Sequence, residues 1–331
     1  MRQGGWAWGV GVAALLGAVF AALALGRYPI PLASLLPGSG AMDPAVAAVL
    51  WNVRLPRVLA AILVGAGLAG AGAAFQGMFR NPLASPDLLG VSVGASLGAV
   101  LGIFFGLPVA GVQAAAFVGG LGAVAAVALL VDAVRRGAGG DPVLLLVLAG
   151  IALGALLGAA ISLLKALADP YNQLPAITFW LLGSLSAVTR GDLLAAAMPA
   201  GPGLLLLFLL RWRLNLLTLG EDEARALGAP TGLLRGAAIL GATLATAAVT
   251  ALAGAVGWVG LVVPHVARLL VGPGNRRLMP IAACAGAIFM VAADTLARSV
   301  SASEIPIGIL TDLIGVLAFL AVLPRVRRGW I

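Results

Sequence analysis

Ten stretches of mostly apolar residues run along this chain, and each is close to the length that crosses a bilayer as a helix. A spanning helix needs roughly 20 such residues. The expected spans are residues 6–26, 54–79, 88–106, 111–132, 143–166, 190–211, 231–252, 257–271, 279–297 and 306–323. Of all residues, 62% are hydrophobic and only 10% are charged, whereas about a quarter are charged in a typical soluble domain. The sequence therefore predicts an all-α membrane protein of about ten transmembrane helices, with residues 1–331 forming a single transmembrane domain.

The distribution of basic residues predicts how the chain is oriented. With ten spans, both termini lie on the same side of the membrane. If that side is the cytoplasm, fourteen of the twenty basic residues lie inside and six outside. This asymmetry follows the positive-inside rule, so we expect cytoplasmic termini.

Several kinds of chemistry are excluded by residue type. The chain has one cysteine, Cys284, and one histidine, His265, which cannot build a Cys/His metal centre. The only lysine, Lys165, follows Leu164, so the Gly-Lys-Ser/Thr of a Walker phosphate loop is absent. The arginines are scattered and form no basic stripe, which argues against nucleic acid as a partner. We expect no catalytic residues, metal or cofactor in this chain.

Glycines recur every four residues in two of the expected spans. Gly90, Gly94, Gly98, Gly102 and Gly106 would share one helix face, and Gly150, Gly154 and Gly158 repeat the spacing. Small residues at this spacing let a neighbouring backbone approach closely. Residues 65–70, Gly-Ala-Gly-Leu-Ala-Gly, match the sequence of a dinucleotide-binding fingerprint. Because they lie within an expected membrane span and not in a strand–turn–helix unit, we interpret these glycines as helix packing too.

Two carboxylates fall within expected spans, where a charge is costly and is a functional hypothesis by default. Asp294 lies four residues before Arg298, a spacing that allows the two to pair along one helix face. Asp312 has no partner that the sequence identifies.

One long polar segment, residues 215–230, separates two spans on the expected cytoplasmic side. Thr218 could cap a short helix whose first turn holds Glu221, Asp222 and Glu223. Ala224 and Leu227 would give that helix a small apolar face. The segment is either a solvated connector or a docking surface for a cytoplasmic partner.

Six ordered blocks of sequence resemble the FecCD permeases, which serve iron-siderophore, haem and vitamin B12 uptake. The blocks are RLPRVLAAILVGAGLAGAGAAFQGMFRNPLASPDLLGVSVGAS (54–96), LLLVLAGIALG (144–154), FWLLGSL (179–185), LGEDEARALG (219–228), GWVGLVVPHVARLLVG (257–272) and EIPIGILTDLIG (304–315). The resemblance implies a vitamin B12 permease-like bundle, the transmembrane domain of a type II ABC importer. It also implies a homodimer in the bacterial inner membrane, two cytoplasmic ATPase subunits that bind ATP and Mg, and an extracytoplasmic binding protein.

The resemblance also implies roles for individual residues. Docking of the binding protein falls to Arg54, Arg57 and Arg298. The cytoplasmic gate falls to Asn81 and Leu83, and to Val143 and Leu144 at the start of the fifth span. Coupling to the ATPase falls to Leu219, Gly220, Glu221, Asp222, Glu223, Ala224, Arg225, Leu227 and Gly228. The family pattern has alanine where this chain has Asp312.

Alternatives remain open at this stage. The same fold could import an oxyanion such as molybdate or tungstate instead of an iron chelate, haem or corrinoid. An ion-coupled secondary transporter could use Asp294 and Asp312 as ion sites. His265 as a haem ligand and a membrane-embedded enzyme are weaker alternatives, because no cluster of acids, Cys and His has usable spacing.

Overall fold

The computed structural model describes residues 3–26, 28, 30, 43–138, 141–219, 221–301 and 303–326, and every regular element in these ranges is a helix. The ten principal helices are α1 Gln3–Ala24, α3 Leu55–Phe79, α4 Val91–Phe104, α5 Val109–Ala138, α6 Pro142–Leu167, α8 Arg190–Leu210, α11 Thr231–Ala253, α12 Val259–Val271, α13 Asn275–Ser299 and α14 Ile307–Val326. Each coincides with one predicted apolar block. Six spans are long and apolar enough to cross a membrane, and α1, α4, α12 and α14 contain shorter apolar stretches.

The remaining elements are short. They are α2 Pro44–Val49, α7 Gln173–Leu181, α9 Leu214–Leu217 and α10 Glu221–Ala226, with a π-helical turn Leu50–Arg54 that joins α2 to α3 and a 3-10 turn Pro86–Leu89 before α4. The sequence reading missed α2 and α7. It also began two spans too early, because α4 starts only after Gly90 (φ 76°) and α12 only after Trp258 (φ 64°). A left-handed residue at each position interrupts the helix that the apolar pattern predicts.

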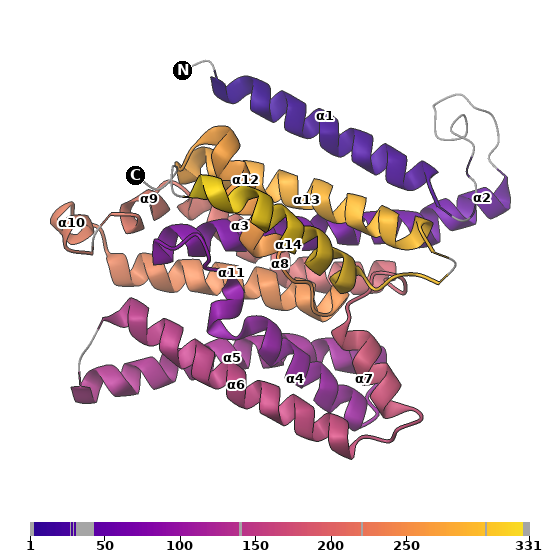
Figure 1. Cartoon of the computed structure of the whole chain (residues 1–331), viewed down its shortest axis with the longest axis horizontal. Coiled ribbons are helices and arrows are strands. Elements are labelled where there is room, and N and C mark those ends of the chain that lie inside the picture. Colours follow the sequence, from indigo (N-terminus) through magenta and orange to yellow (C-terminus); the bar gives the residue numbers. More distant parts are fainter. Residues whose placement is uncertain are drawn as a thin grey trace.

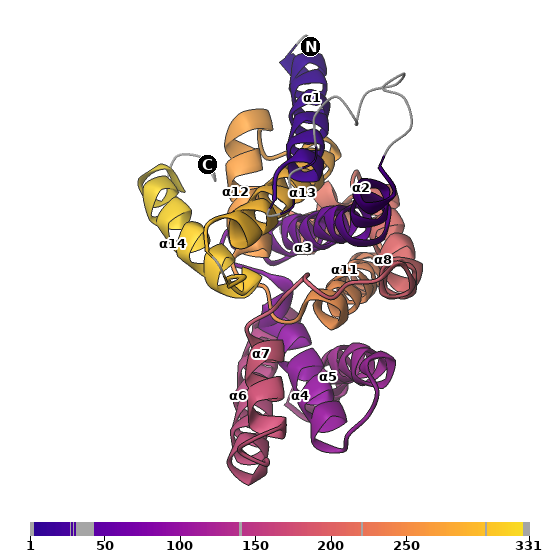
Figure 2. The same cartoon turned by 90° about the vertical axis from the view of Figure 1, so that its right-hand side faces the viewer.

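The helices form two groups. α4, α5, α6 and α7 pack together, and α3 is the centre of the second group, in contact with α8, α11, α12 and α13 (Figure 1). α11 joins the groups through its contacts with α4 and α5. Figure 2 shows α14 and the α6–α7 pair on the same side of the molecule, at the edges of the two groups. Large apolar side chains such as Leu129, Leu156 and Met198 point outward and are mostly exposed, as expected of helices that face lipid.

The two ends of the bundle differ. α1 begins and α14 ends at the end that carries α10 (Figure 1). Both ends of the described chain therefore lie on one side, as the even number of spans predicts. The opposite end carries α2, the end of α1 and the start of α3. We call these the α10 end and the α2 end.

Close backbone approach at glycines holds the helices together. A Cβ added to Gly94 or Gly98 of α4 would lie 2.5 or 2.0 Å from a carbonyl oxygen of α5. A Cβ at Gly150 would lie 1.9 Å from the carbonyl oxygen of Leu88. The packing prediction is confirmed at these positions. Within the described part of the chain it is wrong for Gly154 and Gly158, where an added Cβ meets no atom within 4 Å. It is also wrong for Gly90 and Gly106, which flank α4 with positive φ and have no described atom within 4 Å of an added Cβ.

Candidate functional site

The polar segment 215–230 projects from the α10 end between α8 and α11. α10 contacts α9 and α11, and its one buried residue is Ala224, which packs into the core. Leu227, directly after α10, is 66% exposed. Leu227 and the charged residues around it therefore leave this face of the element accessible from outside the bundle.

The predicted cap of this element is wrong. Thr218 ends α9, and its hydroxyl donates to the carbonyl oxygen of Asn215 at 2.7 Å. α10 begins separately at Glu221, after Gly220, which lies outside the described residues. The acidic first turn of α10 is present as predicted.

The two parts of the predicted gate lie on elements that touch. Asn81 and Leu83 are exposed in the connection between α3 and α4, where the Asn81 side chain accepts the Leu83 N–H at 2.9 Å. Val143 and Leu144 are in the first turn of α6, which is capped by Asp141. α6 packs directly on the 3-10 turn of that connection. The sequence alone could not pair these segments, which are 60 positions apart.

A small cavity with a few polar groups in a mostly apolar lining lies beside the segment that leads into α12. Its volume is about 240 Å³, and Ser85, Asp87, Thr246 and Trp258 are among its lining residues. The Thr246 hydroxyl is buried and has no hydrogen-bond partner in the part of the chain that the structure describes. Such a group is ordinarily satisfied by water, so we expect ordered water in this cavity.

Asp312 of α14 lies beside Gly257, in the segment that leads into α12. Its carboxylate packs on the backbone of Gly257, where an added Cβ would lie 2.3 Å from Oδ1. The residue is exposed, and no ion pair with another described residue is found. A carboxylate open to lipid is costly, so this face of α14 is expected to border water or a second chain.

The three arginines predicted to dock a partner are buried instead. Arg54, Arg57 and Arg298 are 4%, 7% and 7% exposed. Arg57 donates to Asp294 at 2.8 and 3.1 Å and to both carboxylate oxygens of Glu304 at 3.0 Å. Because a guanidinium bound this way is not available to a partner, we correct the docking assignment to a structural one.

Arg54 and Arg298 cap the end of α1. Arg54 donates to the carbonyl oxygens of Leu23, Ala24 and Tyr28, the second at 2.9 Å. Arg298 donates to the carbonyl oxygens of Ala22 and Leu25, the latter at 2.9 Å. The last carbonyls of a helix lack partners within it and attract cations. These contacts therefore fasten α1 to α3 and α13.

Asp294 is the centre of this buried cluster. The predicted pair with Arg298 is present at 3.6 Å, but the closer partner is Arg57 of α3. Glu304, one third exposed at its side chain, completes the cluster. The carboxylate of Asp294 is thus committed to two arginines, which does not suit the site of a transported ion.

A second buried network crosses α3 and α12. Arg268 donates to the Gln76 side chain at 3.0 Å, and Gln76 donates to the carbonyl oxygen of Leu261 at 2.8 Å. Sequence reasoning missed both residues, because Arg268, near the end of the expected span 257–271, was counted only as one of the fourteen basic residues on the cytoplasmic side. A cation in the last turn of an apolar stretch was the available signal. His265, on the same helix, is 5% exposed, which does not suit a ligand for cargo.

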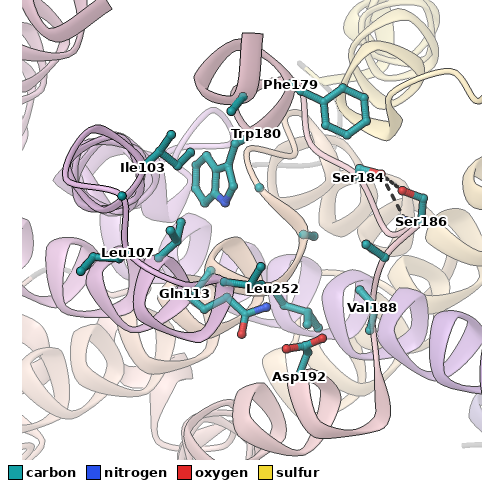
Figure 3. A pocket seen from close by; sticks show the side chains of 18 residues that line it. Ile103, Leu107, Gln113, Phe179, Trp180, Ser184, Ser186, Val188, Asp192 and Leu252 are labelled. Carbon is teal, nitrogen blue, oxygen red and sulfur yellow. Dashed lines mark hydrogen bonds between the residues drawn. The ribbon is translucent and has the colours of Figure 1, made fainter. Parts of the chain in front are cut away.

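The largest cavity among those found lies between the two helix groups near the α2 end. It measures about 520 Å³, and its walls come from α4, α5, α7, α8 and α11. Figure 3 shows Trp180, Ile103 and Leu107 along one side, with Asp192 and Val188 across from them. Ser184 and Ser186 bond each other at 2.9 Å, and Asp192 is engaged in the capping box of α8 with Thr189. Gln113 also lines the cavity, and the rest of the lining is mostly apolar, so this cavity suits a hydrocarbon chain better than a charged solute.

Among the described residues, no three His, Cys, Asp or Glu side chains come together as a metal site would require.

Comparison with known proteins covers nearly the whole chain. Residues 14–325 match the FecCD transport family. The chain is 40% identical to the molybdate import system permease protein MolB of Haemophilus influenzae over 288 residues, which are 87% of this chain and 84% of that protein. It is 40% identical to the hemin transport system permease protein HmuU of Yersinia pestis over 287 residues, 84% of each chain.

A solved structure has the same fold. It is an inward-facing conformation of a metal-chelate type ABC transporter, matched with a TM-score of 0.87 and 38% sequence identity over 97% of this chain and 99% of that chain.

Proposed function

This chain belongs to the FecCD transport family, and on that premise we propose that it is the permease subunit of a binding-protein-dependent ABC importer that carries an iron chelate, haem or a corrinoid. The observation that carries the proposal is the full-length match in both sequence and fold. Transport by such a subunit requires no chemistry from its own side chains. ATP and Mg would be bound by a partner ATPase, since this chain lacks the lysine of a phosphate-binding loop.

The proposed assembly is a homodimer with two cytoplasmic ATPases and one extracytoplasmic binding protein. α10 supports an ATPase at the α10 end, because it presents an exposed leucine and charges beyond the bundle. The open side of α6 at Gly154 and Gly158, and the exposed carboxylate of Asp312 on α14, support a second copy on the side where those helices lie (Figure 2).

We propose that the α10 end faces the cytoplasm of a bacterial inner membrane. The arginine asymmetry supports this orientation. The α2 end, with the buried arginine cluster beneath it, would then receive the binding protein.

Molybdate or a related oxyanion is the second candidate cargo. It is favoured by the similarity to the Haemophilus influenzae molybdate permease protein. The identity to the hemin permease protein is equal, so overall identity does not separate the two cargo classes. Ion-coupled secondary transport is disfavoured, because the Asp294 carboxylate is already bound by Arg57 and Arg298.

Reconstitution tests the proposal directly. The chain, its ATPase and its binding protein are placed in liposomes, and uptake of a ferric chelate, haemin, cobalamin and molybdate is measured. Uptake of one of these should require all three proteins and internal ATP. Uptake that continues without the ATPase and follows a proton or sodium gradient would refute the proposal.

Leu227→Asp should remove most of the coupling to the ATPase. A charge at this exposed apolar contact should lower copurification of the ATPase and binding-protein-stimulated ATP hydrolysis about tenfold, since a central apolar contact is worth at least 1–2 kcal/mol. Tyr171→Asp is the control for ATPase copurification, because Tyr171 is 86% exposed in the connection after α6, at the opposite end from α10. Equal ATPase binding by the Leu227 variant and the parent would contradict a docking role for this element.

A further inference from the structure

A charged cavity lies directly beside α10, and the proposed function gives it no role. Its volume is about 440 Å³. Its walls come from the end of α3, the end of α5, the start of α6, α10 and the start of α11. It therefore lies where the coupling element, the α3–α4 connection and the first turn of α6 meet.

Four arginines converge on this cavity from four different elements. They are Arg80, Arg135, Arg225 and Arg235. Two carboxylates, Asp141 and Asp222, also line it. The lining thus carries a formal charge of about +2 when all six groups are ionised.

The two carboxylates are placed to serve their own helices. Asp141 accepts the N–H of Val143 at 2.8 Å and so caps α6. Asp222 lies in the first turn of α10, where a negative charge is favoured by the helix dipole. The described contacts include no ion pair for Arg80 or Arg135, whose side chains are exposed.

Arg80 lines the cavity from a backbone conformation that is unfavourable for a residue other than glycine. It ends α3 in the left-handed conformation with φ 49°, which a non-glycine residue adopts at a cost of about 1 kcal/mol. Glycine would fit that backbone without strain. The arginine side chain places a positive charge at the C-terminal end of α3, where the helix dipole favours it, and beside the cavity.

We propose that the cavity binds a tetrahedral oxyanion, either a free dianion such as phosphate or molybdate or the phosphate group of an anionic lipid. Guanidinium groups match such oxygens with paired hydrogen bonds, and the arginines of the lining outnumber its carboxylates. Basic pockets between transmembrane helices on the cytoplasmic side commonly hold anionic headgroups. A bound anion would fasten α10 to the ends of α3 and α5.

Binding itself is independent of the proposed transport function, whereas an effect on ATP turnover rests on it. The test therefore begins with the purified full-length chain in detergent free of phospholipid. Phosphate, sulfate and molybdate are each added and compared with chloride at equal ionic strength, and the apparent melting temperature is recorded. The dianions should raise the apparent melting temperature by several degrees. Once their concentration is well above the dissociation constant, the increase should grow with the logarithm of that concentration.

Charge-neutralising variants locate the site. Arg80→Gln and Arg135→Gln should each weaken the apparent affinity for phosphate about tenfold, the usual loss for a charged hydrogen bond. Asp222→Asn should strengthen it. Arg136→Gln is the matched control, because Arg136 is the next residue on α5, is paired with Asp132 at 2.5 Å and does not line the cavity.

Two arms distinguish the source of the anion. In the first arm, the protein is placed in nanodiscs of phosphatidylglycerol or of phosphatidylcholine. The bound group is a lipid headgroup if phosphatidylglycerol stabilises the protein more, if this effect needs Arg80 and Arg135, and if inorganic phosphate has no effect. A response to inorganic phosphate in detergent identifies a free anion. Equal stabilisation by chloride and phosphate together with no lipid preference, or a full response retained in both arginine variants, would overturn the proposal. Loss of ATP-driven uptake alone would bear only on the transport function.

Discussion

Replacing Asp294 by alanine should destabilise the protein by about 3–5 kcal/mol, because it leaves two buried arginines without their shared counter-charge. Arg57 and Arg298 would keep their positions between α3, α13 and the end of α1, and the side chain of each is 8% exposed. Only Glu304, which is partly exposed, would remain to balance them. The measurement is the apparent free energy of unfolding in mixed detergent micelles.

A surface ion pair gives the control. Asp132→Ala removes the partner of Arg136, whose side chain is 80% exposed, and such pairs contribute about 0–1 kcal/mol. The double variant Asp294→Asn with Arg57→Gln should recover part of the loss, since it removes one of the unpaired charges. If Asp294→Ala were no more destabilising than Asp132→Ala, the buried cluster would not hold α1, α3 and α13 together.

The fold was predictable because each membrane helix carries its own signal. Ten apolar blocks predicted ten helices, and their even number predicted that both ends lie on one side. Apolar pattern alone could not predict the breaks at Gly90 and Trp258, because these depend on backbone conformation within an apolar run. It also could not predict that α3 would be the centre of one helix group, since that follows from packing between distant segments.

The place of α10 outside the bundle was predictable, and the burial of the arginines was not. Residues 221–226 stand out as polar between apolar spans, so their place outside the bundle follows from composition. Arg54, Arg57 and Arg298 lie at the ends of spans, where an exposed and a buried arginine read the same in sequence. Their burial depends on Asp294, Glu304 and the carbonyls of α1, which are more than 25 positions away from Arg54 and Arg57.

Glycine spacing predicted close helix contacts without identifying the partners. The closest approach in the described part of the chain lies outside these patterns, at Gly72 of α3 against α12. A Cβ added to Gly72 would lie 1.8 Å from the carbonyl oxygen of Gly260. No flexible side chain can yield here, since the neighbouring atoms are backbone.

Gly72→Ala should therefore force α12 away from α3 and destabilise the protein by about 3 kcal/mol, the upper part of the range for overpacking. The shift would also disturb the bond from Gln76, one turn further along α3, to the carbonyl oxygen of Leu261 on α12. The apparent melting temperature in detergent and the protection of the α12 backbone amides from hydrogen exchange are the measurements. Both should fall.

Gly154→Ala on α6 is the matched control, and its effect on stability should have the opposite sign. An added Cβ meets no atom within 4 Å there, and alanine is favoured over glycine in a helix by about 1 kcal/mol. The isolated chain should become slightly more stable. If the proposed dimer closes on this side of α6, the same substitution should instead weaken self-association. A Gly72 variant as stable as the Gly154 variant would show that α3 and α12 do not approach as closely as their glycines allow.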